Sequence, residues 1–124
     1  MSLEKINSLL SALSTNPFYQ KKLGGLSSAS SLEEYSAKIP LTTKAELAAD
    51  QKLHPPYGSN LTYPLESYHR FHQTSGTSGQ PMIWLDDKAG WEWLCENWAW
   101  VWEKAGVTPG QAAFFPFSFG PFLG

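Results

Sequence analysis

The segment from Thr74 to Pro81 reads TSGTSGQP, and it constrains the fold of this chain more than any other stretch. Strand-like sequences flank it on both sides, YHRFHQ before it and MIWL after it. Glycine and small hydroxyl residues add little bulk, so the backbone N–H groups of such a loop can approach an anion closely. The side chains of Thr74, Ser75, Thr77 and Ser78 add hydroxyl donors. The pattern therefore predicts a strand–loop–strand unit whose loop can cradle a phosphate.

A polar turn between two strands is the simpler alternative, because Gly, Ser and Thr are ordinary turn residues. The loop differs from the common Walker phosphate loop, which needs glycines five residues apart followed by Lys and Ser or Thr. Here Gly76 and Gly79 are three residues apart and Gln80 follows. Because the loop contains no lysine, the charge of a bound phosphate would have to be met by Mg²⁺ and by groups elsewhere.

The order of residues in the loop resembles the signature of the adenylate-forming, AMP-producing ligases, in which Ser/Thr-Ser-Gly-Thr-Thr/Ser-Gly-x-Pro recurs. The chain is more specifically similar to the phenylacetate–coenzyme A ligase branch of that family, through landmarks that span nearly its whole length. Gln80 departs from the pattern, since many relatives have lysine there. In chain order the landmarks are NPFYQKKL at 16–23, IPLTTKAEL at 39–47, Arg70 with His72, GVTPG at 106–110 and FSFG at 117–120.

The resemblance implies an α/β fold with an incomplete large domain. Residues 1–52 would form a helical cap. Residues 53–124 would form a partial AMP-binding subdomain, the opening strand–loop–strand–helix–strand of the large domain of an adenylate-forming ligase, with the phosphate loop at 74–81.

The resemblance also implies a two-step reaction, in which a carboxylate attacks MgATP to give an acyl-adenylate and coenzyme A then displaces AMP. The implied cofactors are ATP, Mg²⁺ and coenzyme A, and the expected substrate is an aryl acid such as phenylacetate. The residues implied to hold the departing phosphates are Thr74, Ser75, Gly76, Thr77, Ser78, Gly79 and Gln80. The residues implied to border the acyl pocket are Phe117, Ser118, Phe119 and Gly120, for which packing in a sheet core is an equal alternative.

Length and motif content predict a piece of such a ligase. A chain of 124 residues can bury one core, whereas adenylate-forming ligases are several times longer. Nothing here corresponds to the family's later Tyr-Gly-x-Thr-Glu segment, its ribose-binding aspartate or its C-terminal-domain lysine. We therefore assign no catalytic residue and expect the isolated chain to be inactive, with truncation inside the apolar run at 122–124. A short nucleotide-binding or self-assembling module is the alternative.

Composition predicts a folded, soluble protein of the reducing cytoplasm. Hydrophobic residues make up 42% and charged residues 16%, which argues against general disorder. A net charge of −2 gives no electrostatic reason for binding nucleic acid or an anionic membrane. The apolar stretch 112–124 is too short to span a bilayer and is broken by Pro116, Gly120 and Pro121. Cys95 is the single cysteine and has no internal disulfide partner.

Apolar periodicity and capping residues predict the helices. We expect helices over 3–13, from Pro17 to Gly24, over 32–39 behind Ser31, and from Thr43 to about residue 51. A further helix should begin near Ala89, behind the possible caps Asp86 and Asp87, and end at Lys104. A strand is expected over 112–117, which with the strand at 82–85 would suggest a parallel pair.

The helix expected over 89–104 carries five of the six tryptophans. One face, expected to pack in the core, contains Trp91, Leu94, Cys95, Trp98 and Trp102. Trp93 and Trp100 lie on the opposite side, and aromatic residues on both sides normally mean protein on both sides. We therefore expect the isolated chain to associate with itself. Stacking on nucleic acid ranks lower, because glutamates interleave with the aromatic residues where a basic groove would be needed.

Other chemistry has weaker support in the sequence. His69 and His72 would point to opposite faces of a strand, and no CxxC or HExxH is present, so no metal site is expected. No Gly-x-Ser-x-Gly elbow is present, which argues against a hydrolase. Arg70 and His72 should share a strand face with Tyr68. That face either orients the loop or is an ordinary hydrogen-bonded surface.

Overall fold

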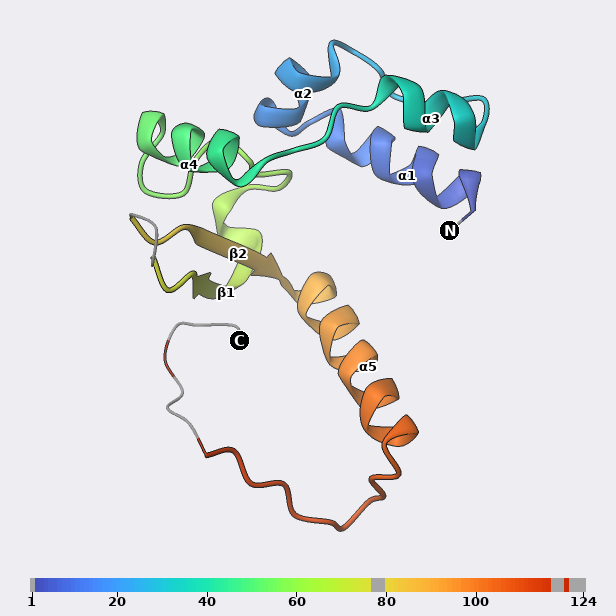
Figure 1. The fold of residues 1–124 in the computed structure, drawn as a ribbon. Helices are drawn as coiled ribbons and strands as arrows, with labels where there is room; N and C mark the ends of the chain where they lie inside the picture. The colour runs from blue at the N-terminus through green and yellow to red at the C-terminus, as the bar shows by residue number, and fades with distance from the viewer. Residues whose placement is uncertain (1, 77–79, 117–119, 121–124) are drawn as a thin grey trace.

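The structure is a computed structural model of the full chain, and it describes residues 2–76, 80–116 and 120. Four short helices, a β-hairpin and one long helix follow one another along the chain. Three of the short helices occupy one end of the molecule, the fourth lies over the hairpin, and the long helix runs away from the hairpin (Figure 1).

The four short helices lie where the sequence predicts, and the third and fourth begin behind the predicted caps Ser31 and Thr43. They are α1 (Leu3–Leu13), α2 (Pro17–Leu23), α3 (Leu32–Lys38) and α4 (Lys44–Leu53). At the start of α4 the Thr43 hydroxyl accepts from Glu46 N and the Glu46 carboxylate accepts from Thr43 N, which confirms the expected capping box. At α3 only half of the box forms, because the Glu34 carboxylate accepts from Ser30 N.

The small core of the described residues lies mainly among these helices. Ile6 and Leu10 of α1 are 3% and 2% exposed, and Ala29 packs there at 5%. Asn7 fixes Ala29 by accepting from its N–H at 2.8 Å and donating to its carbonyl at 3.0 Å. The link between α2 and α3 is therefore held against α1 by hydrogen bonds from the Asn7 side chain to the backbone, as well as by apolar packing.

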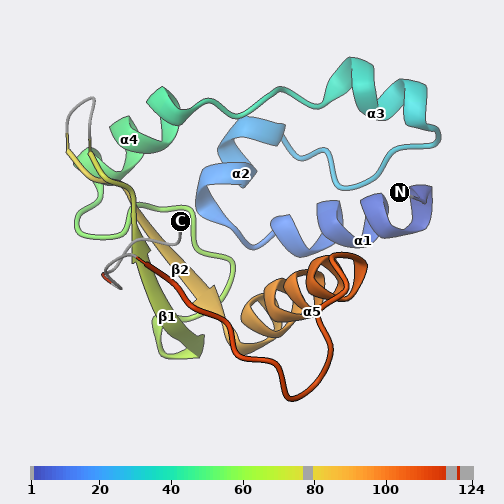
Figure 2. The same cartoon turned by 60° about the horizontal axis from the view of Figure 1, so that its bottom comes forward.

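The hairpin joins β1 (Tyr68–Gln73), which follows a short 3₁₀ turn (Leu65–Ser67), to β2 (Ile83–Asp87). The strands are antiparallel, with Gln73 opposite Ile83 and an irregularity between Tyr68 and Arg70 (Figure 2). The short connection explains the direction, because parallel strands need a crossover of a dozen or more residues. The predicted strand–loop–strand unit is thus confirmed.

The long helix α5 (Lys88–Lys104) starts directly after β2, with the Asp87 carboxylate accepting from Gly90 N at 2.7 Å. Its predicted acidic cap is therefore confirmed at Asp87. The chain then reverses at Gly106, whose φ of 80° lies in the left-handed region that favours glycine.

The prediction of a strand over 112–117 is wrong for the residues that the structure describes. Residues 112–116 are irregular and exposed, and Phe117 lies outside the described residues. Within the described residues the sheet contains only β1 and β2, and residues 112–116 add no strand to it. The parallel pair that this strand would have completed is accordingly not found there.

Candidate functional site

The loop from Thr74 to Pro81 is closed at its base by Thr74 and Met82. Thr74 N donates to the Met82 carbonyl at 2.9 Å, and Met82 N donates to the Thr74 hydroxyl oxygen at 2.9 Å. Met82 is only 4% exposed, so the base is also anchored by apolar packing. Thr74, expected to contact phosphate, is therefore the residue that closes the loop, and its hydroxyl proton remains able to donate.

The structure places part of the predicted loop at one end of the hairpin. Ser75 is exposed, and Gly76 has a φ of 68°, a conformation that favours glycine. Gln80 and Pro81 are exposed on the returning arm. Thr77, Ser78 and Gly79 lie outside the described residues, so the predicted contacts of these three stay predictions.

The predicted acyl-pocket segment lies mostly outside the described residues. Phe117, Ser118 and Phe119 are among those not described, and Gly120 is exposed. Both interpretations of this segment, pocket border and sheet core, therefore remain expectations from the sequence.

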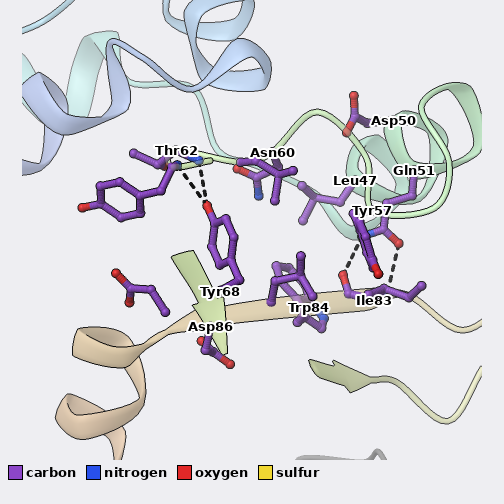
Figure 3. A pocket seen from close by; sticks show the side chains of 14 residues that line it. Leu47, Asp50, Gln51, Tyr57, Asn60, Thr62, Tyr68, Ile83, Trp84 and Asp86 are labelled. Carbon is purple, nitrogen blue, oxygen red and sulfur yellow. Dashed lines mark hydrogen bonds between the residues drawn. The ribbon is translucent and has the colours of Figure 1, made fainter. Parts of the chain in front are cut away.

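The outer edge of the loop exit is bound by Gln51 of α4. Its side-chain nitrogen donates to the Ile83 carbonyl at 2.6 Å, and its side-chain oxygen accepts from Ile83 N at 3.0 Å (Figure 3). Sequence reasoning gave Gln51 no role, because nothing local connects a residue near the end of one helix to a strand 32 positions later.

A polar cavity of about 210 Å³ lies beside this contact, between α4, the loop over residues 57–63 and β2 (Figure 3). Its walls are tied by hydrogen bonds: the Asp50 carboxylate accepts from the N–H and hydroxyl of Ser59, both at 2.6 Å. The Tyr68 hydroxyl accepts from Thr62 N and Tyr63 N at 3.0 and 3.1 Å. These contacts fix the loop against α4 and β1.

A larger, mainly apolar cavity of about 910 Å³ lies on the other side of Gln51. The loop exit, residues 80–83, forms one wall, and α4 forms the other with Ala45, Ala48, Ala49 and two lysines, Lys44 and Lys52. These lysines are cationic groups beside the loop exit, where the loop itself has none.

Of the three residues predicted to share a strand face, Arg70 and His72 both lie against α5, whereas the strand is irregular between Tyr68 and Arg70 and the Tyr68 hydroxyl binds the loop over residues 57–63. The His72 ring stacks on Trp91 at 5.4 Å with an 18° interplanar angle, and the Arg70 guanidinium lies 5.3 Å from the same indole. His72 Nε2 is buried and lies 3.3 Å from an Asp86 carboxylate oxygen, but out of line for a hydrogen bond. The face therefore connects the strand that enters the loop to the long helix.

The aromatic stripe expected to pack in the core is largely exposed. Trp91, Leu94 and Trp102 are half-buried, but Trp98 is 58% exposed and Cys95 is also exposed. The side carrying Trp93 and Trp100 is exposed at 64% and 61%. The prediction that the face with Trp91, Cys95 and Trp98 packs in the core is thus wrong for Cys95 and Trp98. The reason is that only the N-terminal end of α5 lies against the hairpin (Figure 1).

Two further features are absent from the described part of the chain. Among residues 2–76, 80–116 and 120, no group of three or more His, Cys, Asp or Glu is placed to hold a metal ion. Within the same residues, no helix has the length and apolar character needed to cross a bilayer.

Solved structures of 2-hydroxyisobutyryl-CoA ligase are similar to this chain. An open conformation in complex with 2-HIB-AMP and CoA matches with a TM-score of 0.76 and 26% identity, over 87% of this chain and 26% of that one. The complex with 2-HIB-AMP and CoA in the thioesterification state matches with a TM-score of 0.76 and 28% identity, over 87% and 24%. The fold is that of the N-terminal part of an adenylate-forming ligase.

A third structure of that ligase, in the postadenylation state with 2-HIB-AMP, matches with a TM-score of 0.75 and 26% identity, over 87% of this chain and 23% of that one. The chain thus spans about a quarter of the length of these ligase structures. No protein-family model matches the chain, and a comparison with curated proteins finds no match.

Proposed function

We propose that this chain supplies the phosphate-binding loop of an AMP-forming carboxylate–CoA ligase, an acid–thiol ligase of the phenylacetate–CoA ligase type. The observation that carries the proposal is the loop TSGTSGQP, closed by Thr74 and Met82, inside a fold like that of a ligase bound to an acyl-adenylate and CoA. Such an enzyme joins a carboxylate to AMP and then transfers the acyl group to the thiol of CoA.

The chemistry proposed for the loop is positioning and charge stabilisation. Attack at a phosphorus atom needs an aligned phosphate chain more than it needs a protein nucleophile. The left-handed Gly76 and the small side chains around it keep the backbone open to phosphate oxygens. Mg²⁺ would supply the positive charge that a loop ending in Gln80 lacks, and residues 74–80 would hold the departing β- and γ-phosphates.

The proposed substrate is an aryl acid such as phenylacetate, on the resemblance of the sequence and the phenylalanine-rich segment 114–122. The similar structures contain the adenylate of 2-hydroxyisobutyrate, a small hydroxy acid, which defines the competing substrate class. A ligase of this kind uses soluble metabolites, so we propose a cytoplasmic location.

A chimera tests the proposal. The corresponding segment of 2-hydroxyisobutyryl-CoA ligase would be replaced by this chain, and acid-dependent pyrophosphate release measured with phenylacetate and 2-hydroxyisobutyrate. Gly76→Ala and Thr77→Ala should each lower adenylation roughly a hundredfold, the scale of losing one aligned donor. Thr108→Ala, in the exposed turn after α5, is the matched control and should retain activity. Full activity of both loop variants would refute the assignment.

We also propose that the isolated chain associates with a second copy through α5. The chain exposes 9318 Å², whereas a compact monomer of this length exposes about 6600 Å². Three exposed tryptophans of α5, Trp93, Trp98 and Trp100, contribute to that excess. Sedimentation velocity over a range of concentrations tests this, and a monomer at every concentration would contradict it.

A further inference from the structure

The outer edge of β2 presents two backbone groups at Ile83. Across from β1, residues 74 and 82 form the hydrogen-bonded pair, with Thr74 N donating to the Met82 carbonyl. Hydrogen bonding alternates along an antiparallel strand, so the N–H and C=O of Ile83 point away from β1. At a sheet edge these groups would otherwise be left to water or to another strand.

The Gln51 side chain forms hydrogen bonds with both the N–H and the carbonyl of Ile83. A primary amide carries a donor and an acceptor side by side, like a peptide group. The two hydrogen bonds, 2.6 Å to the carbonyl and 3.0 Å from the N–H, reproduce what a neighbouring strand would offer at that position. Figure 3 shows the side chain reaching from α4 to Ile83.

This pairing holds the returning arm of the loop from the side opposite β1. Met82 is tied to Thr74 on one side, and the next residue, Ile83, is tied to Gln51 on the other. Gln51 and Ile83 also line both cavities, so their contact separates the polar cavity from the apolar one.

The helix that carries Gln51 is itself anchored. The capping box between Thr43 and Glu46 fixes the start of α4, and Lys22 of α2 forms an ion pair with Glu46 at 2.5 Å. A connected series of contacts therefore runs from α2 through α4 to the exit of the loop.

We propose that Gln51 is a positioning residue for the phosphate-binding loop, which fixes the returning arm at Ile83 and couples it to the helical segment. The inference rests on the proposed function of the loop. Gln51 acts through the backbone of Ile83, and no contact with nucleotide is required of it.

Two variants of the full chain separate hydrogen bonding from packing. Gln51→Met keeps the length of the side chain but removes both hydrogen bonds, and Gln51→Ala also removes the packing. Gln111→Ala is the matched control, because Gln111 accepts from a backbone N–H, that of Thr108, at 2.7 Å in a turn remote from the loop. Two readouts are followed by NMR: the hydrogen exchange rate of the Ile83 amide, and the shifts of the 74–83 amides during titration with MgATP.

Both Gln51 variants should speed exchange of the Ile83 amide by at least about tenfold and weaken MgATP binding several-fold, while Gln111→Ala should leave both readouts unchanged. Unchanged exchange at Ile83 in both variants would overturn the inference. Faster exchange with unchanged MgATP affinity would overturn it as well, because the arm would then be free without consequence for the loop. Failure of the unmodified chain to bind MgATP would instead count against the proposed function, with the Gln51–Ile83 contact judged on exchange alone.

Discussion

The helical segment α1–α4 and the long helix α5 use their side chains in opposite ways. In the described residues, four of the five buried side chains, Ile6, Leu10, Asn16 and Ala29, belong to the segment of short helices, and the fifth is Met82 at the base of the loop. The helix α5 is the longest and the richest in tryptophan, yet none of its residues is buried. Helix length and apolar content therefore do not identify the core of this chain.

Polar contacts explain why the short helices hold together. Helices of 7 to 11 residues are marginal on their own, so packing and capping must stabilise them. Each begins at a residue whose side chain accepts from a backbone N–H of its first turn. By contrast, α5 contacts the hairpin through Trp91, and most side chains of its later turns are exposed, with Trp102 half-buried beside Phe115.

The sharpest test of this contrast compares two adjacent leucines of α1. Leu10 is 2% exposed and Leu9 is 51% exposed, so replacing each with alanine makes the same chemical change in two environments. Leu10→Ala should lower the free energy of unfolding by about 2–5 kcal/mol, and Leu9→Ala by less than about 0.5 kcal/mol. Urea unfolding followed by circular dichroism measures both. If both variants lowered the free energy of unfolding equally, the helical segment would have no defined core.

The next largest effect is expected at Asn16, which is 1% exposed. Its side-chain nitrogen donates to Asn60 Oδ1 at 2.9 Å and to Thr62 Oγ1 at 3.1 Å, while its oxygen caps α2 by accepting from Tyr19 N. Asn16→Ala should lower the free energy of unfolding by about 2–3 kcal/mol, because it removes a cap and leaves partners unpaired.

The control for Asn16 lies on α5. Asn97 donates to the Trp93 carbonyl at 2.7 Å but is exposed. Asn97→Ala should change the free energy of unfolding by less than about 0.5 kcal/mol. If Asn97→Ala lowered the free energy of unfolding as much as Asn16→Ala, burial would not be what decides how much stability each hydrogen-bonded side chain contributes.

Sequence patterns predicted the contacts that are local in the chain. The capping box at Thr43 and Glu46 spans one helical turn, and Asp87 caps α5 three residues away, so spacing alone is enough to expect them. The hairpin follows from two strand-like segments around a glycine-rich loop. The match to the N-terminal part of an adenylate-forming ligase agrees with landmarks spread along the chain.

Contacts between distant residues were not predictable in the same way. Gln51 meets Ile83 and Asn16 meets Thr62 because the fold brings them together, and an amide side chain carries no sign of its partner. Residues 112–116 have a strand-like sequence but add no strand to the sheet of β1 and β2, so strand propensity alone did not decide their structure. The exposure of Trp98 likewise depends on what lies beside α5.

A smaller effect should appear at low pH in the helical segment. The hydrogen bond from Lys22, followed by those from Thr43, lowers the pKa of Glu46 from 4.5 to about 2. A carboxyl group with a lower pKa in the folded state contributes stability above its unfolded pKa and loses it as the pH falls through the folded one. Stability should therefore decline from about pH 4.5 to about pH 2.

Glu46→Gln isolates the contribution of this carboxylate. The variant should show a shallower decline in the urea midpoint over the same pH range, because its side chain no longer titrates. Salt should weaken the effect, since the Glu46 side chain of the pair with Lys22 is exposed. An identical pH dependence in both proteins would mean that the carboxylate does not stabilise the start of α4.

The smallest effect on stability, and the largest on association, is expected from the exposed tryptophans of α5. Trp93→Gln combined with Trp100→Gln should change the free energy of unfolding by less than about 0.5 kcal/mol, because neither side chain is buried. The same change should shift sedimentation toward the monomer.

Trp91→Gln is the matched control: it removes the indole that contacts Arg70 and His72, so it should loosen the docking of α5 and lower stability without abolishing association. If the Trp93 and Trp100 variant instead unfolds readily, these side chains stabilise the monomer and the contrast between the two regions fails.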